Sequence, residues 1–164
     1  MILRQIRAFV LPILVVLVVP YGVLNAAATP SHPSPLITWL FRLTGLVVGG
    51  LGLALFGWCI SLFAQIGQGT LAPWDPTRHL VAAGPYRLSR NPMITSVALM
   101  LLGEALFWRS GSVALWAGLF ILINHVYFVL AEEPGLEKRF GDDYRAYKKQ
   151  VPRWLPRWKG RSFR

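Results

Sequence analysis

Four apolar stretches divide the chain, and most of each stretch is free of charge. They cover residues 8–24, 36–66, 93–108 and 112–130. A helix needs roughly 20 apolar residues to cross the ~30 Å hydrocarbon core of a bilayer. The pattern therefore predicts about four transmembrane helices, of which the third is short.

The first apolar stretch has two interpretations. Arg4 and Arg7 precede it and small residues follow it at 26–28, which is also the arrangement of a cleaved secretory signal. The run is longer than the roughly 7 to 15 residues of a typical signal core, which favours a retained helix. Pro12 and Pro20 are expected to bend that helix.

Residues 67–92 form the long polar connection between the second and third stretches. Gly84-Pro85 and Asn91-Pro92 each predict a turn, because proline lacks the amide that a continuing helix needs. The loop would then face water and bilayer together, which suits it to ligand binding.

The C-terminal region, residues 132–164, shows a third pattern. Apolar residues recur at three- and four-residue spacing while basic residues take the other positions, which predicts an amphipathic helix on the membrane surface. Pro134-Gly135 is expected to break or kink the chain as it leaves the last span. The apolar positions are Leu136, Phe140, Tyr144, Tyr147 and Val151.

Composition supports an all-α integral membrane protein with a single domain, 1–164. The 164 residues are 54% hydrophobic and 15% charged, too few charges for an ordinary soluble domain. The net charge is +10, and most of the basic residues follow Glu137. In a membrane protein this tail indicates contact with anionic headgroups, so no nucleic-acid partner is expected.

Basic residues also predict the orientation. They gather at both ends of the chain and in the 67–92 loop, whereas the connection at 29–35 has none. Because cytoplasmic segments of membrane proteins are rich in Lys and Arg, both termini and the loop are expected in the cytoplasm of a multi-pass protein.

Metal binding is not expected. Cys59 is the only cysteine, and His32, His79 and His125 are far apart, with no HExxH or CxxC spacing. The sequence leaves the oligomeric state open.

Two charged residues and a group of glycines lie inside the apolar stretches. Arg42 and Glu104 reach similar depths in the four-span arrangement, which predicts a buried ion pair; the alternative is that Glu104 turns toward Arg109 or water. Glycines from Gly45 to Gly57 are interpreted as a surface for close helix packing.

The ordered motifs of the loop and tail resemble membrane-embedded methyltransferases, the isoprenylcysteine carboxyl methyltransferase and phospholipid N-methyltransferase group. The resemblance covers residues 67–156. The matching residues are Leu80, Val81, Gly84, Tyr86, Arg90, Pro92, Glu132, Glu133, Phe140, Gly141, Tyr144, Tyr147, Val151 and Pro152.

This resemblance implies transfer of a methyl group from S-adenosylmethionine to a lipid-like acceptor from the bilayer. It implies cofactor contacts by ten residues, and Gly67-Gln68-Gly69 resembles a further, weaker cofactor motif. The implied cofactor-binding residues are Arg78, His79, Leu80, Val81, Tyr86, Asn91, Pro92, Met93, Ile94 and Glu132.

The catalytic residue stays open, with Arg90, Glu133 and His125 as candidates. Each has a structural alternative. The glutamate can be a carboxylate at a helix end, Arg90 a headgroup anchor and His125 a packed core residue.

The chain departs from the family pattern at three positions that bear on the acceptor. Asn91 replaces a histidine, Ile94 a tyrosine, and Phe128 an arginine that holds the substrate carboxylate in the isoprenylcysteine enzymes. These changes leave the acceptor, and the choice among O-, N- and S-methylation, open. Two other functions are also considered: an NADPH-dependent membrane sterol or enone reductase, and a basic membrane anchor without catalysis.

Overall fold

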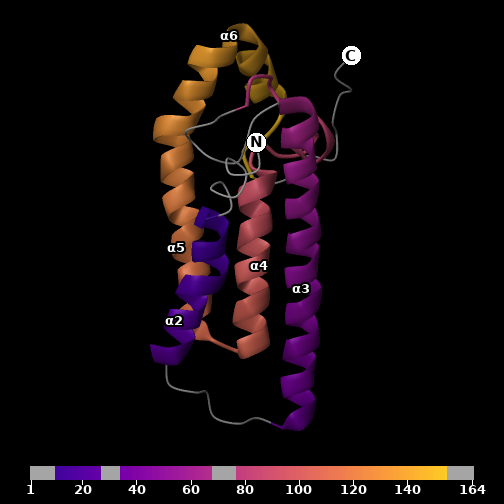
Figure 1. Cartoon of the computed structure of the whole chain (residues 1–164), viewed down its shortest axis with the longest axis vertical. Helices are drawn as coiled ribbons and strands as arrows, with labels where there is room; N and C mark the ends of the chain where they lie inside the picture. The colour runs from indigo at the N-terminus through magenta and orange to yellow at the C-terminus, as the bar shows by residue number, and fades with distance from the viewer. Residues whose placement is uncertain (1–9, 27–33, 68–76, 155–164) are drawn as a thin grey trace.

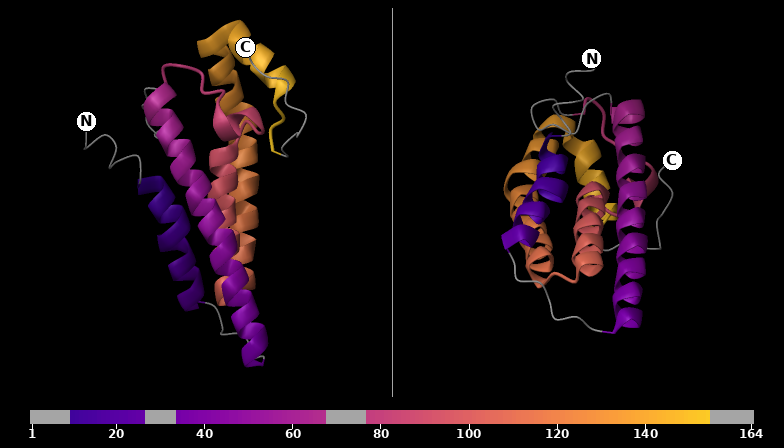
Figure 2. Two further views of the ribbon diagram at one scale, coloured as in Figure 1. Left: turned by 90° about the vertical axis from the view of Figure 1, so that its right-hand side faces the viewer. Right: turned by 60° about the horizontal axis from the view of Figure 1, so that its bottom comes forward.

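The computed structural model describes residues 10–26, 34–67 and 77–154, and every regular element in those ranges is helical (Figure 1). The helices run along one long axis, and α6 folds over one end of the bundle, as Figure 2 shows. The elements are η1 (Leu14–Val18), α2 (Val19–Ala26), α3 (Pro35–Leu62), η2 (Phe63–Gly67), η3 (Gly84–Arg87), α4 (Pro92–Trp108), α5 (Gly111–Tyr127), η4 (Phe128–Glu132) and α6 (Glu133–Gln150).

Two continuous helices are long and apolar enough to cross a bilayer. They are Pro35–Gly67 and the apolar part of Gly111–Gln150; Val10–Ala26 and Pro92–Trp108 are apolar but shorter. Leucines on their outer faces are exposed, for example Leu115 at 75%. Such a surface is stable in lipid and not in water. All four predicted apolar stretches are helical in their described residues, while the number of them that cross a membrane stays a prediction.

Glycines hold α3 and α4 side by side along the half of the bundle that lies away from the loop. A Cβ on Gly45 would lie 2.6 Å from the Gly103 carbonyl oxygen, and one on Gly103 would lie 2.6 Å from the backbone of Gly49. Backbones this close leave no room for a side chain. The packing interpretation of the glycines is confirmed at Gly45 and Gly52, whereas Gly50 and Gly57 face open space.

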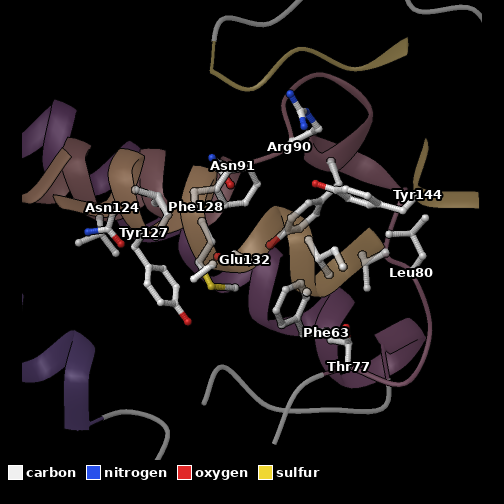
Figure 3. A pocket seen from close by; sticks show the side chains of 18 of the residues that line it. Phe63, Thr77, Leu80, Arg90, Asn91, Asn124, Tyr127, Phe128, Glu132 and Tyr144 are labelled. Atoms are coloured by element: carbon white, nitrogen blue, oxygen red, sulfur yellow. The ribbon is translucent and has the colours of Figure 1, made fainter. Parts of the chain in front are cut away.

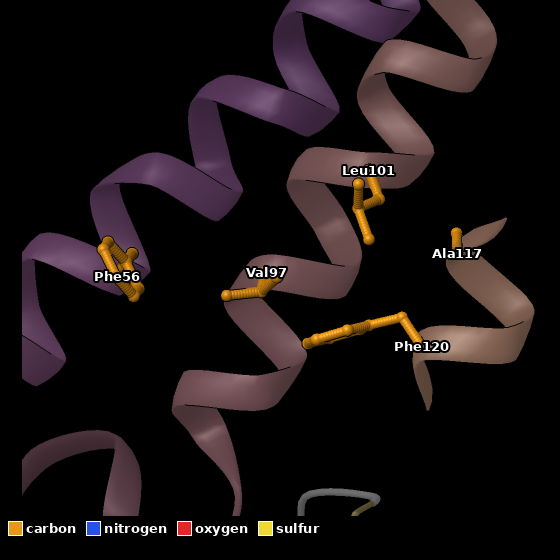
Figure 4. Packing of buried hydrophobic residues seen from close by; sticks show 5 residues of the cluster. All are labelled: Phe56, Val97, Leu101, Ala117 and Phe120. Carbon is orange, nitrogen blue, oxygen red and sulfur yellow. The ribbon is translucent and has the colours of Figure 1, made fainter. Parts of the chain in front are cut away.

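A small apolar core joins α3, α4 and α5 (Figure 4). Leu101 and Ala117 are fully buried in it, and Phe56, Val97 and Phe120 complete the cluster. Its side chains fix the position of α4, whose first turn carries the residues that follow the loop.

The Arg42–Glu104 ion pair is absent from the described residues, so that prediction is wrong. The Arg42 guanidinium instead lies 5.7 Å from the ring centre of Trp39 and 5.8 Å from that of Phe107. A guanidinium stacks favourably on aromatic faces, so the apolar helices hold this charge without a carboxylate. Glu104 lines an apolar groove between α3, α4 and the first helix.

Pro134-Gly135 does not break the last helix as expected. The chain passes through the wide π turn η4 and continues as α6 to Gln150. Proline has no backbone N–H to donate to the preceding turn. The wider π turn directly before Pro134 lets the helix continue without that hydrogen bond. The kink comes later, at Gly141, whose φ of 53° favours glycine.

The apolar face of α6 covers the loop. Tyr144, Tyr147 and Val151 form a buried cluster with Leu80 and Ala82 of the loop. The predicted periodicity is confirmed, but these residues pack on protein, which corrects the expectation that they enter the membrane surface. Residues 155–164 of the predicted tail lie outside the described residues.

Candidate functional site

A cavity of about 430 Å³ lies between the loop, the start of α4, the end of α5 and α6. Figure 3 shows Glu132 in its middle, with Asn124 and Tyr127 toward one side and Arg90 and Tyr144 toward the other. The volume falls in the range of small-molecule sites, which are about 300 to 1,000 Å³.

Short local structures shape the loop wall of this cavity. Gly84 has a φ of 54°, and a Cβ there would meet Leu62 and Trp58, so the turn η3 packs directly on α3. Tyr86 follows in the same turn and stacks on Phe63, with 5.6 Å between ring centres. The Gly-Pro pair therefore turns the chain as predicted and delivers Tyr86 to the cavity.

Most of the predicted cofactor-binding residues meet at the cavity. The residues of that set in its lining are Leu80, Val81, Tyr86, Asn91, Met93, Ile94 and Glu132. Arg78 and His79 are outside the lining, and both of their amides donate to the carbonyl of Gly67. Pro92 is buried in the first turn of α4, directly after the N-cap residue Asn91.

The three candidate catalytic residues have different positions. Arg90 lines the cavity. Glu133 and His125 are not among its lining residues in the described chain. His125 accepts a 3.0 Å hydrogen bond at Nδ1 from the Trp154 indole, which fits a packed histidine.

Four buried polar atoms of the lining have no hydrogen bond of good geometry among the described residues. They are the Tyr86 hydroxyl, which lies beside the Cys59 thiol, the Tyr144 hydroxyl, which lies beside the Arg90 side chain, Arg90 Nε and Asn91 Nδ2. Leaving a buried polar group unpaired costs about 1 to 3 kcal/mol, so native proteins rarely keep several together. Their concentration at one cavity makes it the candidate site for a polar ligand.

Glu133 sits beside the cavity in a dense ion cluster. Its Oε1 lies 2.8 Å from Arg90 Nη1 and 2.8 Å from Arg153 Nε, and its Oε2 lies 3.1 Å from Lys148 Nζ. Burial alone would raise the pKa of Glu133, but hydrogen bonds from Arg153 and Lys148 and the nearby Arg90 charge lower it. Glu133 is thus a carboxylate fully committed to protein cations.

Glu132, the next residue, has the opposite environment. It follows the last apolar residue of the spanning stretch, lines the cavity and has no ion pair among the described residues. Glu132 is exposed as a whole residue, but desolvation of its carboxyl group in the cavity raises the pKa of Glu132 to about 7, and the Glu133 charge adds to the rise. Adjacent carboxylates with separated pKa values commonly have separate roles.

Several lining residues were missing from the predicted set. Tyr144 and Tyr147 of α6 had a visible signal, because their spacing marked an apolar face whose partner was misassigned. Phe63 and Asn124 had none, since single residues in apolar helices carry no motif. No group of three or more metal-ligating side chains occurs in the part of the chain that the structure describes.

Comparisons with known proteins cover the same region. A family model described as phospholipid methyltransferase matches residues 42–143, more than half of the chain. A Haemophilus influenzae protein described as uncharacterized is 45% identical over 65 residues, which are 38% of this chain and 100% of that protein. No solved structure matches the chain. The family match includes the loop, α4, α5 and Glu132 and ends one residue before Tyr144.

Proposed function

The chain belongs to the phospholipid methyltransferase family, and from this premise we propose that its cavity binds S-adenosylmethionine and donates the methyl group to a lipid-like acceptor. The family acts on lipids in general, which leaves the acceptor of this chain to be identified. The relative from Haemophilus influenzae, described as uncharacterized, adds no substrate.

One observation carries the proposal: the cavity offers unpaired donors and an unpaired carboxylate together. Within the described part of the chain, Arg90 Nε and Asn91 Nδ2 are buried donors without partners, and Glu132 supplies the acceptor. A zwitterionic amino-acid group needs both kinds of partner. The amino-acid part of S-adenosylmethionine has this character.

Different residues of the cavity would contact different parts of the cofactor. Arg90 and Asn91 would donate to its carboxylate, while Glu132 would accept from its ammonium group or a ribose hydroxyl. Tyr86, held by its stack on Phe63, would contact the adenosine. When bound, S-adenosylmethionine supplies a methyl group already activated by the positive sulfur.

The opposite wall suits an acceptor that arrives from the bilayer. It is formed by apolar residues of the first helix, α5 and η4, including Val15, Phe120 and Phe128. Polar donors on one side and hydrocarbon on the other separate a water-soluble ligand from a lipid-soluble one.

The chain contributes positioning and exclusion of water more than acid–base groups. Of the candidate catalytic residues, Glu133 is held by three cations and His125 by Trp154. Holding two reactants in a productive orientation lowers a barrier substantially without a general base. The tyrosines of α6 close the water side of the cavity.

Isothermal titration with S-adenosylmethionine, S-adenosylhomocysteine and NADPH tests the proposal. The first two ligands should bind and NADPH should not. A reductase would show the reverse pattern of binding. Glu132→Gln and Tyr86→Ala should weaken binding tenfold or more, the order expected for a hydrogen bond to a charged group, about 1.5 to 3 kcal/mol.

The matched controls are Asp142→Asn and Tyr21→Ala, which change an exposed carboxylate and an exposed tyrosine outside the cavity. Both controls should bind like the wild type. Normal binding by both site variants would refute the assignment.

We also propose the four-span arrangement with the loop and α6 in the cytoplasm. In a Cys59→Ser background, a cysteine at Lys138 should react with an impermeant reagent only from the cytoplasmic side, and one at Ser112 only from the outside. Both positions are exposed. Labelling of both from one side would contradict the arrangement. The equivalent tests at Ser31, Asp75 and Ser162 fall outside the described residues.

A further inference from the structure

Two segments that are distant in the sequence are fastened together above the cavity: the loop residues 86–91 and the C-terminal residues 147–153. The Tyr147 hydroxyl donates to the Tyr86 carbonyl at 2.7 Å, and the Arg90 amide donates to the Pro152 carbonyl at 2.9 Å. The Ser89 hydroxyl donates to the Arg153 carbonyl at 2.9 Å. We call this set of contacts the clasp.

Glu133 lies at the centre of the clasp and forms ion pairs with both segments. One of its oxygens accepts from Arg90 on the loop side and from Arg153 on the C-terminal side, each at 2.8 Å. The side chains of Arg90 and Glu133 are only 8% and 5% exposed. Water therefore cannot replace either partner cheaply.

We propose that Glu133 is a positioning residue that closes the clasp and thereby orients Arg90 toward the cofactor carboxylate. This inference rests on the proposed function. A guanidinium is planar, so a partner that holds Nη1 also fixes the direction of the other donors. Arg90 Nη1 is taken by Glu133, while Nε has no partner among the described residues.

Charge in the cluster supports the same role. Arg90, Arg153 and Lys148 bear on Glu133, and Lys148 also meets Glu137 at 2.9 Å. Within this cluster three cations face two carboxylates, and the further carboxylate of Glu132 belongs to the cavity itself. The cluster can therefore present a cationic donor to an anionic ligand group, while Glu132 faces another part of the ligand.

The decisive experiment compares two ligands that differ in the carboxylate. S-adenosylhomocysteine carries the amino-acid group, and 5′-methylthioadenosine lacks it. Arg153→Ala removes one side of the clasp while leaving Glu133 and Arg90 in place. It should weaken S-adenosylhomocysteine at least tenfold, the scale of one charge-assisted hydrogen bond, and change methylthioadenosine by less than about twofold.

Three further variants complete the design. Arg153→Lys keeps the cation and should restore most of the affinity, and Glu133→Gln should reproduce the selective loss. Arg145→Ala removes an exposed arginine of α6 that pairs with Asp142 outside the clasp. This control variant should leave the affinity for both ligands unchanged.

Hydrogen exchange in the same samples reports on the clasp without any ligand. In Arg153→Ala the Arg90 amide should exchange faster, since its acceptor is the Pro152 carbonyl. Equal weakening of the binding of both ligands would mean that the clasp only supports the general structure of the protein. An unchanged exchange rate of the Arg90 amide would show that Glu133 does not hold the clasp together. Either result overturns the inference. Failure of the wild type to bind any adenosyl ligand would instead refute the proposed function, with the exchange still testing the clasp.

Discussion

The two ends of the helix bundle differ in how completely their groups are packed and hydrogen-bonded. Near the α4–α5 turn, α3 and α4 touch backbone to backbone at Gly45 and Gly103, and the helix start is capped locally by Ser110. At the loop end the helices separate around a cavity, and polar atoms such as Arg90 Nε have no hydrogen bond of good geometry among the described residues. The first end gains stability from contacts that are complete within the protein. The second has unsatisfied polar groups at a cost in stability, which binding of the proposed ligand would offset.

The largest expected effect comes from breaking the closed end. Gly103→Leu places a side chain where a Cβ alone would lie 2.6 Å from the Gly49 backbone, and a backbone cannot rotate away as a side chain can. Overpacking of this kind costs ~3 kcal/mol or more. Thermal unfolding in detergent should show a large fall in the midpoint.

Gly118→Leu on α5 is the matched control, because a Cβ there meets nothing within 4 Å. Its midpoint should stay near that of the wild type. A similar loss in both variants would mean that bulk in the bundle, and not backbone contact, explains the result.

The next largest effect is expected in the pH dependence of cofactor binding at the loop end of the bundle. The pKa of Glu132 is raised to about 7, so the residue is ionised at pH 8 and largely protonated at pH 6. If its negative charge holds the ligand, S-adenosylhomocysteine affinity should fall by up to about tenfold as the pH drops by one unit below 7. Titration at pH 6, 7 and 8 measures this, and Glu132→Gln should flatten the profile.

Stability should move in the opposite direction over part of that range. Because the folded pKa of Glu132 exceeds its ordinary value of 4.5, the folded state holds this proton more tightly. Its contribution to stability is complete below about 4.5 and is lost as the pH rises through 7. A site whose binding improves while its apo stability falls is the expected behaviour of an unpaired carboxylate.

A smaller effect is expected at the α4–α5 turn. The Ser110 side chain accepts a 3.2 Å hydrogen bond from the Val113 amide and so caps α5. Ser110→Ala should lower the free energy of unfolding by ~1 kcal/mol. Cofactor affinity should be unchanged, and a loss of affinity would mean that the two ends are coupled.

The smallest effect is expected from the exposed ion pair of α6. Arg145 and Asp142 lie 2.8 Å apart, but their side chains are 62% and 94% exposed. Water and salt screen such a pair. Asp142→Ala should leave the unfolding midpoint and ligand affinity unaltered, in contrast to any change at Glu133. A clear shift in either measurement would show that surface charge also matters at this end.

The order of hydrophobic and polar residues was enough to predict four apolar helices, the polar loop and the turns at Gly84 and Asn91. These features depend on local chemistry: apolar length, missing proline amides and the conformational freedom of glycine. The motif match also selected seven residues that meet at the cavity. Such residues are readable because the loop carries most of them within one short stretch.

Tertiary structure decided which partners those residues have. The spacing of Tyr144 and Tyr147 specified an apolar face, but a period does not say whether lipid or protein covers it, and here the loop does. Arg42 stacks on aromatic rings and does not pair with Glu104, because pairing depends on side-chain direction as well as position along the helix.

The adjacent glutamates show the same limit most directly. In the sequence, Glu132 and Glu133 are equivalent residues at the end of an apolar stretch. In the folded chain, successive positions on a helix point about 100° apart, so one side chain enters the cavity and the other meets Arg90, Lys148 and Arg153. Two of those cations are supplied by the end of α6 and the segment after it. Only the fold brings them back to the loop, because attraction between charges depends on their distance in space and not along the chain.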